Sequence, residues 1–413
     1  MSTSPSSGLR PSFISPRQAY LAGVACWFMG MGLQFVMIPT LAAVYLRVSA
    51  QELALAQMSI SIPQLLILPF SGRIADRTNG RKLLMVIHLL AVIPPVMIFW
   101  LVWSNNLSYW NLIVYGMSMG AIFAFSAPTR DALLTRVSPV NIQKGVMAAM
   151  ITQFIAQLTG FTLAGIAAPL ADPWALPAMN AIVLFIGFFA AFLLPSYPAL
   201  SDDHGPDPGS KLTAGLKAIY HSRLLFPVLL MNLAVGIIFV GCFMVSFPLI
   251  IRDIFHGGQL EISIISFCFW GGTIATTVLL MLRKPVYHRG RLMIFGVLMG
   301  SIALFFAVTA QNFYAMCLAS LTWGAFAGFN MTMSRTIVQV SAPPRMRAQI
   351  LAFYNLGFIG AAPIGAFAMG MLSPIIGPQL APALASILML FLTISLCLFT
   401  DVLKITRLES ESL

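Results

Sequence analysis

The sequence predicts an all-α membrane protein with about twelve transmembrane helices. Of its 413 residues, 59% are hydrophobic and only 8% are charged, whereas soluble domains carry about 25% charged residues. The apolar runs are about 20 residues long or longer, which is the length that an α-helix needs to cross a bilayer. They do not show the alternating ten-residue pattern of a membrane β-barrel. Lipid is therefore the expected solvent for most of the chain.

Twelve apolar runs are the expected spans, and the basic residues indicate which side each loop faces. With a cytoplasmic N-terminus, 21 of the 23 Lys and Arg residues fall inside, and only Arg47 and Arg252 fall outside. We therefore expect a bacterial inner-membrane protein with both termini on the cytoplasmic side. The expected spans are 19–46, 52–71, 83–103, 109–128, 145–170, 175–195, 224–251, 261–282, 291–310, 312–334, 348–373 and 380–400.

The spans are expected to form two six-helix halves, residues 1–195 and 223–413, joined by a polar cytoplasmic linker at 196–222. A faint repeat supports this division, although chance similarity between apolar helices is an alternative. Parallel halves of this kind are a transporter architecture with the substrate site at their interface. The repeated features are the 13-residue spacing of Pro39 from Glu52 and of Pro248 from Glu261, and the pairs Gly80-Arg81 and Gly290-Arg291.

The loop after the second span reads Gly72-Arg-Ile-Ala-Asp76-Arg77-Thr-Asn-Gly80-Arg81-Lys82. It resembles the signature loop of the major facilitator superfamily, Gly-x-x-x-Asp-Arg/Lys-x-Gly-Arg/Lys-Arg/Lys. The match departs by one extra residue before Gly80, so either Asn79 takes the glycine position or the turn is longer. The resemblance implies the twelve-helix fold of that superfamily.

The resemblance also implies that this loop is a conformational switch whose charged pairs form only when the cytoplasmic side is closed. A carboxylate at a membrane boundary requires partners such as a helix N-terminus or an arginine. A purely topogenic basic loop is the alternative, although it would not need Asp76. The expected switch residues are Gly72, Asp76, Arg77, Gly80, Arg81 and Arg130.

The segment after the fourth span, residues 126–139, resembles the enterobactin-exporter-like branch of the same superfamily. That branch contains siderophore and macrolide exporters, and its pattern places an arginine near the switch at Arg130. Pairing of Arg130 with Asp131 or with a lipid phosphate is the alternative. Span five carries Gly160 and Gly165 where drug/proton antiporters have a glycine motif, but Phe161 replaces the expected proline. Helix packing explains these glycines equally well.

The transport cavity is expected to be lined by amide and aromatic residues within the spans, because such polar groups are costly unless they face water or each other. Helix packing and interhelical hydrogen bonds are the alternative for each of them. The candidates are Gln34, Gln57, Gln64, Gln153, Gln157, Asn232, Trp270, Trp323, Asn330, Tyr354 and Asn355.

Proton coupling has three candidates near outer helix ends, namely Glu52, Asp253 and Glu261. The two glutamates also fit a role as first-turn acids at helix N-termini. No motif for an enzyme, a metal site or a cofactor is present, so neither catalysis nor a cofactor is expected. The net charge of +11 reflects cytoplasmic loops, and nucleic acid is not an expected partner.

The expected function is secondary active transport, most simply proton-coupled efflux of a siderophore-like or amphipathic small molecule. An apolar cavity with a few amides suits such a solute. An uptake carrier for a small solute is the first alternative. A non-transporting receptor or assembly partner on the same scaffold is the second. We expect a monomer in the lipid bilayer, with a small-molecule substrate and protons as the coupling ion.

Overall fold

The computed structural model describes residues 15–138, 142–168, 173–197, 219–222, 224–282, 287–342 and 347–404, and the regular elements in these ranges are all helical. The first group of helices comprises α1 (Pro16–Pro39), its π-helical continuation η1 (Thr40–Tyr45), α2 (Ala50–Arg77), α3 (Gly80–Trp103), α4 (Tyr109–Val137), α5 (Ile142–Ala167) and α6 (Ala175–Phe192). The second group comprises α8 (Leu225–Val235), the π-helical stretches η2 (Gly236–Val240) and η3 (Cys242–Ser246), α9 (Phe247–Asp253), α10 (Gln259–Leu282), α11 (Arg289–Val308), α12 (Phe313–Ser341), α13 (Arg347–Ile376), α14 (Leu380–Phe399) and a short 3-10 turn, η4 (Asp401–Lys404).

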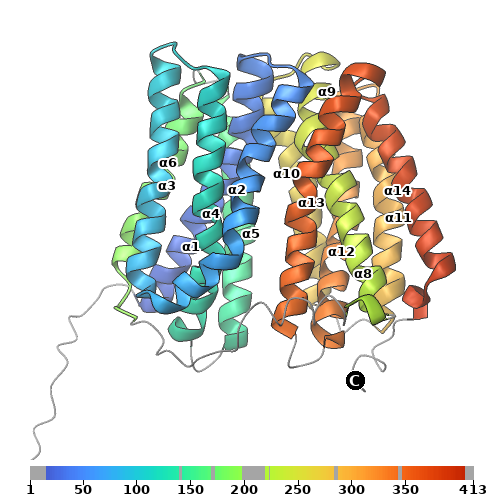
Figure 1. Cartoon of the computed structure of the whole chain (residues 1–413). Helices are drawn as coiled ribbons and strands as arrows, with labels where there is room; N and C mark the ends of the chain where they lie inside the picture. The colour runs from blue at the N-terminus through green and yellow to red at the C-terminus, as the bar shows by residue number, and fades with distance from the viewer. Residues whose placement is uncertain are drawn as a thin grey trace, which may run out of the picture.

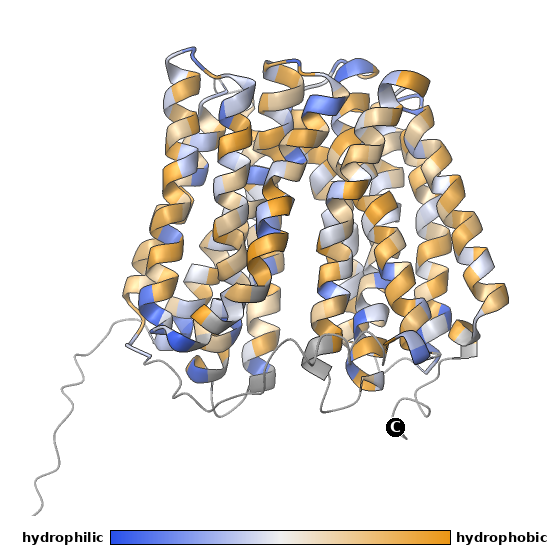
Figure 2. Ribbon diagram, in the orientation of Figure 1, coloured by the Kyte–Doolittle hydropathy of each residue, from blue (hydrophilic) through white to orange (hydrophobic). Residues whose placement is uncertain are grey.

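Long apolar helices make up most of the molecule. Among the described residues, ten helical segments are long and apolar enough to cross a membrane, counting α1 with η1, and α8 through α9, as one segment each. Helices α2 and α12 have 28 and 29 residues and lie beside these segments in the bundle (Figure 1). Apolar residues dominate the middle of the bundle, and hydrophilic residues concentrate toward its ends (Figure 2). The all-α membrane fold is confirmed, whereas the count of twelve spans stays a prediction.

The helices pack in two groups (Figure 1). In the first group, α1 packs on α5 and α6, α2 on α4, and α3 on α4 and α6. In the second, α12 packs on α10 and α11, α11 on α14, and α13 on α8 and η2. Helix α13 also packs on α2, and α10 on α5, so that these two contacts join the groups. The predicted linker lies largely outside the described residues, so the half boundaries at 195 and 223 stay predictions.

Glycines allow the closest helix contacts, and two of these contacts recur in the two groups. A Cβ on Gly32 of α1 would lie 3.0 Å from the Cα of Gly160 in α5. In the second group, a Cβ on Gly241 would lie 2.8 Å from the Cα of Gly365 in α13. Both distances are too short for a side chain, so these helix backbones are in direct contact. Gly160 of the fifth span therefore has a packing role.

The expected switch loop is mostly helical. Helix α2 continues to Arg77 and α3 begins at Gly80, which leaves only residues 78 and 79 between them. Asn79 caps α3, because its Oδ1 accepts from the amide of Lys82 at 3.2 Å, as asparagine side chains do at helix N-termini. Segment 126–138 is likewise the end of α4 rather than a loop.

The two groups are joined by hydrogen bonds near one end of the bundle. We name this the distal end; it lies at the top in Figure 1 and carries loops 46–49 and 254–258. Near this end, three residues form side-chain hydrogen bonds between the groups: Gln57 to Met244, Gln259 to Ala164, and Arg252 to Ala43 and Val48. The opposite end, where α1 begins and α14 ends, is the proximal end.

Candidate functional site

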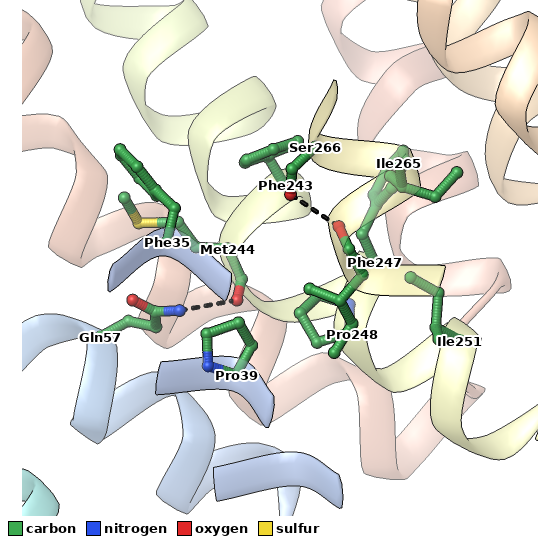
Figure 3. A pocket seen from close by; sticks show the side chains of 11 residues that line it. Phe35, Pro39, Gln57, Phe243, Met244, Phe247, Pro248, Ile251, Ile265 and Ser266 are labelled. Carbon is green, nitrogen blue, oxygen red and sulfur yellow. Dashed lines mark hydrogen bonds between the residues drawn. The ribbon is translucent and has the colours of Figure 1, made fainter. Parts of the chain in front are cut away.

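A small pocket lies between the two groups on the distal side of the bundle (Figure 3). Its volume of about 20 Å³ is room for about one water molecule. None of the lining residues is charged, and most carry aromatic or branched apolar side chains. They come from α1 (Phe35, Pro39), α2 (Gln57), the segment from η3 to α9 (Phe243, Met244, Phe247, Pro248, Ile251) and α10 (Ile262, Ile265, Ser266).

π-Helical turns border this pocket in both groups. Pro39 ends α1 where η1 begins, and Pro248 follows η3 at the start of α9. Isolated π-helical turns widen a helix locally and occur frequently at functional sites. The two prolines of the sequence repeat therefore mark the two faces of the same pocket.

Gln57 provides a hydrogen bond across the pocket (Figure 3). Its Nε2 donates to the backbone carbonyl of Met244 at 3.3 Å. In an α-helix this carbonyl would accept from the amide of residue 248, but Pro248 has no amide hydrogen. The amide of Gln57 therefore donates to a carbonyl that has no α-helical (i+4) donor. The Phe35 carbonyl likewise has no α-helical donor, because the residue four positions later is Pro39, which also lacks an amide hydrogen.

Two predicted tryptophans lie close to the pocket. The Trp270 ring lies 6.2 Å from the Phe35 ring, between centroids, in a contact that joins α10 to α1. The indole Nε1 of Trp270 is buried and has no hydrogen-bond partner among the described residues. Trp323 is fully buried and packs behind the pocket against Phe243 at 6.1 Å and Phe247 at 5.4 Å, between ring centroids. Trp323 thus supports the pocket wall without lining it.

Two other predicted residues, Asn232 and Tyr354, belong to a polar cluster inside the second group. The Nδ2 of Asn232 donates to the carbonyl of Tyr354 at 2.8 Å. The Tyr354 hydroxyl and the Ser334 hydroxyl share a hydrogen bond of 2.8 Å. These bonds link α8, α12 and α13. Asn330 is buried with an unpartnered Oδ1 among the described residues, and Asn355 is exposed.

The remaining predicted glutamines do not line the pocket. Gln34 is buried, and its Oε1 has no partner within the described part of the chain. Gln157 is buried at the close contact of α1 and α5, where its carbonyl faces Gly32. Gln64 and Gln153 are half-buried. The structure brings Gln57 alone of the predicted amides to the pocket wall, and a substrate role for the others stays a prediction.

The expected switch residues surround the turn between α2 and α3. Gly80 packs on Leu133 of α4, where an added Cβ would lie 2.7 Å from the Leu133 Cδ2. The Arg81 guanidinium lies over the Phe192 ring at 5.0 Å. The side chain of Asp76 lies outside the described residues, so its pairing with Arg77 or Arg81 stays a prediction. Gly72 is half-buried, with open space beside its Cα.

Arg130 is held by aromatic rings of α1. Its guanidinium lies over Trp27 at 5.3 Å and over Phe28 at 4.9 Å, and it donates to the hydroxyl of Ser126. Cation–π contacts of this kind hold a guanidinium where water is scarce. The Trp27 ring also meets His88 of α3 edge-on at 5.4 Å. Arg130 thus links α4 to α1 inside the first group.

The three candidate carboxylates are all near the distal end. An oxygen of Glu52 accepts from the amide and the hydroxyl of Ser49, both at 2.8 Å, which forms a capping box on α2. Glu261 accepts from the amide of Gly258 at 2.6 Å. These contacts give both glutamates a role at helix N-termini. Asp253 instead forms an ion pair with Arg252.

Sequence reasoning missed most of the pocket wall. Phe35, Phe243, Met244 and Phe247 look like any apolar residue of a membrane helix. Their only signal was their position beside the two prolines of the repeat. Arg252 also had a signal, because it was one of only two basic residues on the predicted outer side.

Comparison with known proteins agrees with this architecture. Residues 21–413 match the family described as transmembrane secretion effectors. The MFS-type transporter YfiS of Bacillus subtilis is 21% identical over 364 residues, covering 86% of this chain and 85% of YfiS. Macrolide efflux protein A of Enterococcus faecalis is 22% identical over 327 residues, covering 77% of this chain and 99% of that protein.

Solved structures of major facilitator superfamily (MFS) transporters share the fold. The nucleoside transporter NupG superposes with a TM-score of 0.73 at 12% identity, covering 93% of this chain and 99% of NupG. The xylose transporter XylE from E. coli, in an inward open conformation, superposes with a TM-score of 0.68 at 14% identity, covering 95% of this chain and 98% of XylE. The chain therefore belongs to the transmembrane secretion effector family of the major facilitator superfamily, and it is a membrane transporter and not an enzyme.

Proposed function

We propose that this transporter exports an amphipathic or siderophore-like small molecule from the cytoplasm in exchange for protons. The observation that carries the proposal is the uncharged, aromatic pocket between the two helix groups. Pockets for largely apolar ligands combine such walls with a few polar groups that orient the ligand. Relatives named macrolide efflux protein A, at 22% identity, support export of a bulky solute.

The polar groups of the pocket favour a solute that carries hydrogen-bond donors on an apolar body. The carbonyls of Met244 and Phe35 lack an α-helical donor because prolines follow them in the chain, and Gln57 adds an amide that can both donate and accept. A hydroxyl or amine of the solute can replace Gln57 on Met244. The aromatic rings then pack against the apolar body.

The pocket is the narrow end of the transport route in our proposal. A space of about 20 Å³ excludes a bulky solute unless side chains such as Phe243 move. Binding from the proximal side therefore has to displace the aromatic wall. Because that wall also holds the groups together at the distal end, binding is coupled to opening of that end.

Three further parts of the proposal come from the sequence. The proximal end faces the cytoplasm, as the distribution of basic residues predicts. Asp76, Arg77 and Arg81 form a switch that closes this end after the solute has passed. Protons drive the cycle. Of the three candidate carboxylates, we favour Asp253, because it pairs with Arg252, which in turn contacts Val48 of the other helix group.

The test is uptake of labelled candidates into inside-out membrane vesicles given a pH gradient. We expect accumulation of a siderophore or macrolide, and its loss when an uncoupler is added. Accumulation in right-side-out vesicles or whole cells instead, with a small nutrient as the solute, would replace export by uptake.

A pocket variant connects transport to the site. Phe243→Ala should weaken the apparent affinity for the solute roughly 10- to 150-fold, because burying an aromatic side chain contributes about 1.5–3 kcal/mol. The control is Phe306→Ala, since Phe306 is 61% exposed on α11 and lies outside the pocket lining. Equal effects of the two substitutions would place the binding site elsewhere.

A further inference from the structure

The two distal loops repeat each other in backbone detail. Loop 46–49 follows η1, and loop 254–258 follows α9. Arg47 and His256 hold corresponding positions and share a left-handed backbone with φ of 51°. The amides before and after them reach back to helix carbonyls five and six residues earlier. These bonds are Leu46 to Leu41 (2.9 Å), Val48 to Ala42 (3.1 Å), Phe255 to Ile250 (3.2 Å) and Gly257 to Ile251 (2.9 Å).

One position breaks this repeat. Arg252 of the second group corresponds to Ala43 of the first, and its side chain reaches across to the first group. Its Nη1 donates to the carbonyl of Val48 at 2.8 Å and to the carbonyl of Ala43 at 3.3 Å. The guanidinium therefore binds η1 at Ala43, the position that corresponds to its own, and the following loop at Val48.

The acceptors suit a guanidinium. Carbonyls at the C-terminal end of a helix lack intrahelical donors and carry partial negative charge. The amide of Val48 bonds to Ala42 and not to Ala43, so the Ala43 carbonyl is open to Arg252. Hydrogen bonds from a charged donor are about twice as strong as neutral ones. Ala43 and Val48 are both buried, which shields these bonds from water.

Asp253 orients the guanidinium. The Nε and Nη2 of Arg252 bind its two carboxylate oxygens at 2.5 and 2.9 Å. This two-pronged pairing fixes the plane of the guanidinium and leaves Nη1 directed at η1. Asp253 is therefore a positioning residue for the contact between the groups.

We propose that Arg252 is the latch of the distal gate, and that opening of this end requires its release from Ala43 and Val48. The latch holds the same helical segments that border the pocket, because η1 follows Pro39 and α9 begins with Phe247 and Pro248. The inference rests on the proposed alternating-access cycle and not on the identity of the solute or the direction of transport.

The experiment measures opening of the distal end without any substrate. The five native cysteines are replaced, and spin labels are placed on cysteines at Asn106 and Gln311. These residues are exposed in the α3–α4 and α11–α12 loops of the two groups. Pulsed electron resonance in lipid nanodiscs then gives the label-to-label distance distribution. We expect Arg252→Gln to add a longer distance and to raise the open-to-closed ratio at least tenfold.

Two graded variants and a control test the mechanism. Arg252→Lys keeps the positive charge but loses the two-pronged pairing with Asp253. The open-to-closed ratio should therefore rise by less than with Arg252→Gln. Asp253→Asn should also raise it by less, because Nη1 can still reach the carbonyls. The matched control is Arg47→Gln, which removes one positive charge from the same end. Arg47 is exposed and has no side-chain hydrogen bond or ion pair with other described residues.

The outcomes are separable from those of the transport assay. A distance distribution that Arg252→Gln and Arg47→Gln change equally, or that neither changes, overturns the latch. If Arg252→Gln fails to insert, the lysine variant decides, because an unchanged ratio with lysine at 252 also overturns it. A distal end that opens in Arg252→Gln supports the latch even if no tested solute is exported.

Discussion

Replacement of Gln57 by leucine tests the hydrogen bond that crosses the pocket. Leucine has a similar size, so the main change is loss of the donor to the Met244 carbonyl at 3.3 Å. A buried acceptor that loses its partner costs about 1–3 kcal/mol. Because the bond joins the two helix groups, this cost falls on the closed distal end. The open-to-closed ratio should therefore rise about 5- to 150-fold.

The same carbonyl offers an internal control at Pro248. In Pro248→Ala, residue 248 gains an amide hydrogen that can donate to Met244 within the helix. The loss of Gln57 should then cost less, and a double-mutant cycle should give a coupling of about 1 kcal/mol between the two positions. The assay is the distance distribution between labels at Asn106 and Gln311.

The result that refutes this reasoning is additivity. If Gln57→Leu opens the distal end equally with and without the Pro248→Ala substitution, the Met244 carbonyl is not the group that Gln57 satisfies. If Gln57→Leu leaves the distribution unchanged in both backgrounds, the bond makes no contribution to closure, and the role of Gln57 is confined to solute binding. Transport assays on the same four proteins separate these cases.

Two further predictions concern folding and topology. Gly365→Val should prevent stable insertion, because an added Cβ would overlap the carbonyl of Ile237. The control Gly271→Val should insert normally, since only Phe267 lies near its Cβ, at 4.0 Å. Detergent-solubilised yield and the size-exclusion profile measure both variants, and equal yields would contradict the close contact of η2 with α13. A reporter fused after Leu413 should be active only in the cytoplasm, and periplasmic activity would overturn the predicted orientation.

The class of the protein followed from composition and motifs. A chain with 8% charged residues must satisfy its backbone within helices if it lies in lipid, and the segment from Gly72 to Lys82 pointed to the superfamily. The family match over residues 21–413 confirms this interpretation. The alternative role of Glu52 at a helix N-terminus also came from the sequence, because capping depends on neighbouring residues only, and its side chain does form a local cap.

The site was harder to predict because it depends on which helix faces are apposed. Gln57 and Gln153 look alike in the sequence, since each is one of two glutamines in an apolar span. Only the packing of α2 on α13, beside η3, places Gln57 against Met244. Asn232 had the same signal, and packing instead directs it to the carbonyl of Tyr354.

The sequence by itself determined what is local along the chain: the helices, their caps, the membrane surroundings and the prolines at 39 and 248. These depend on side-chain hydrophobicity and on hydrogen bonds within a few residues. Tertiary structure alone decided that the two prolines border one pocket and that Arg252 binds the carbonyls of Ala43 and Val48. Those contacts join residues about 200 positions apart, and backbone carbonyls leave no trace in the side-chain pattern from which a sequence is read.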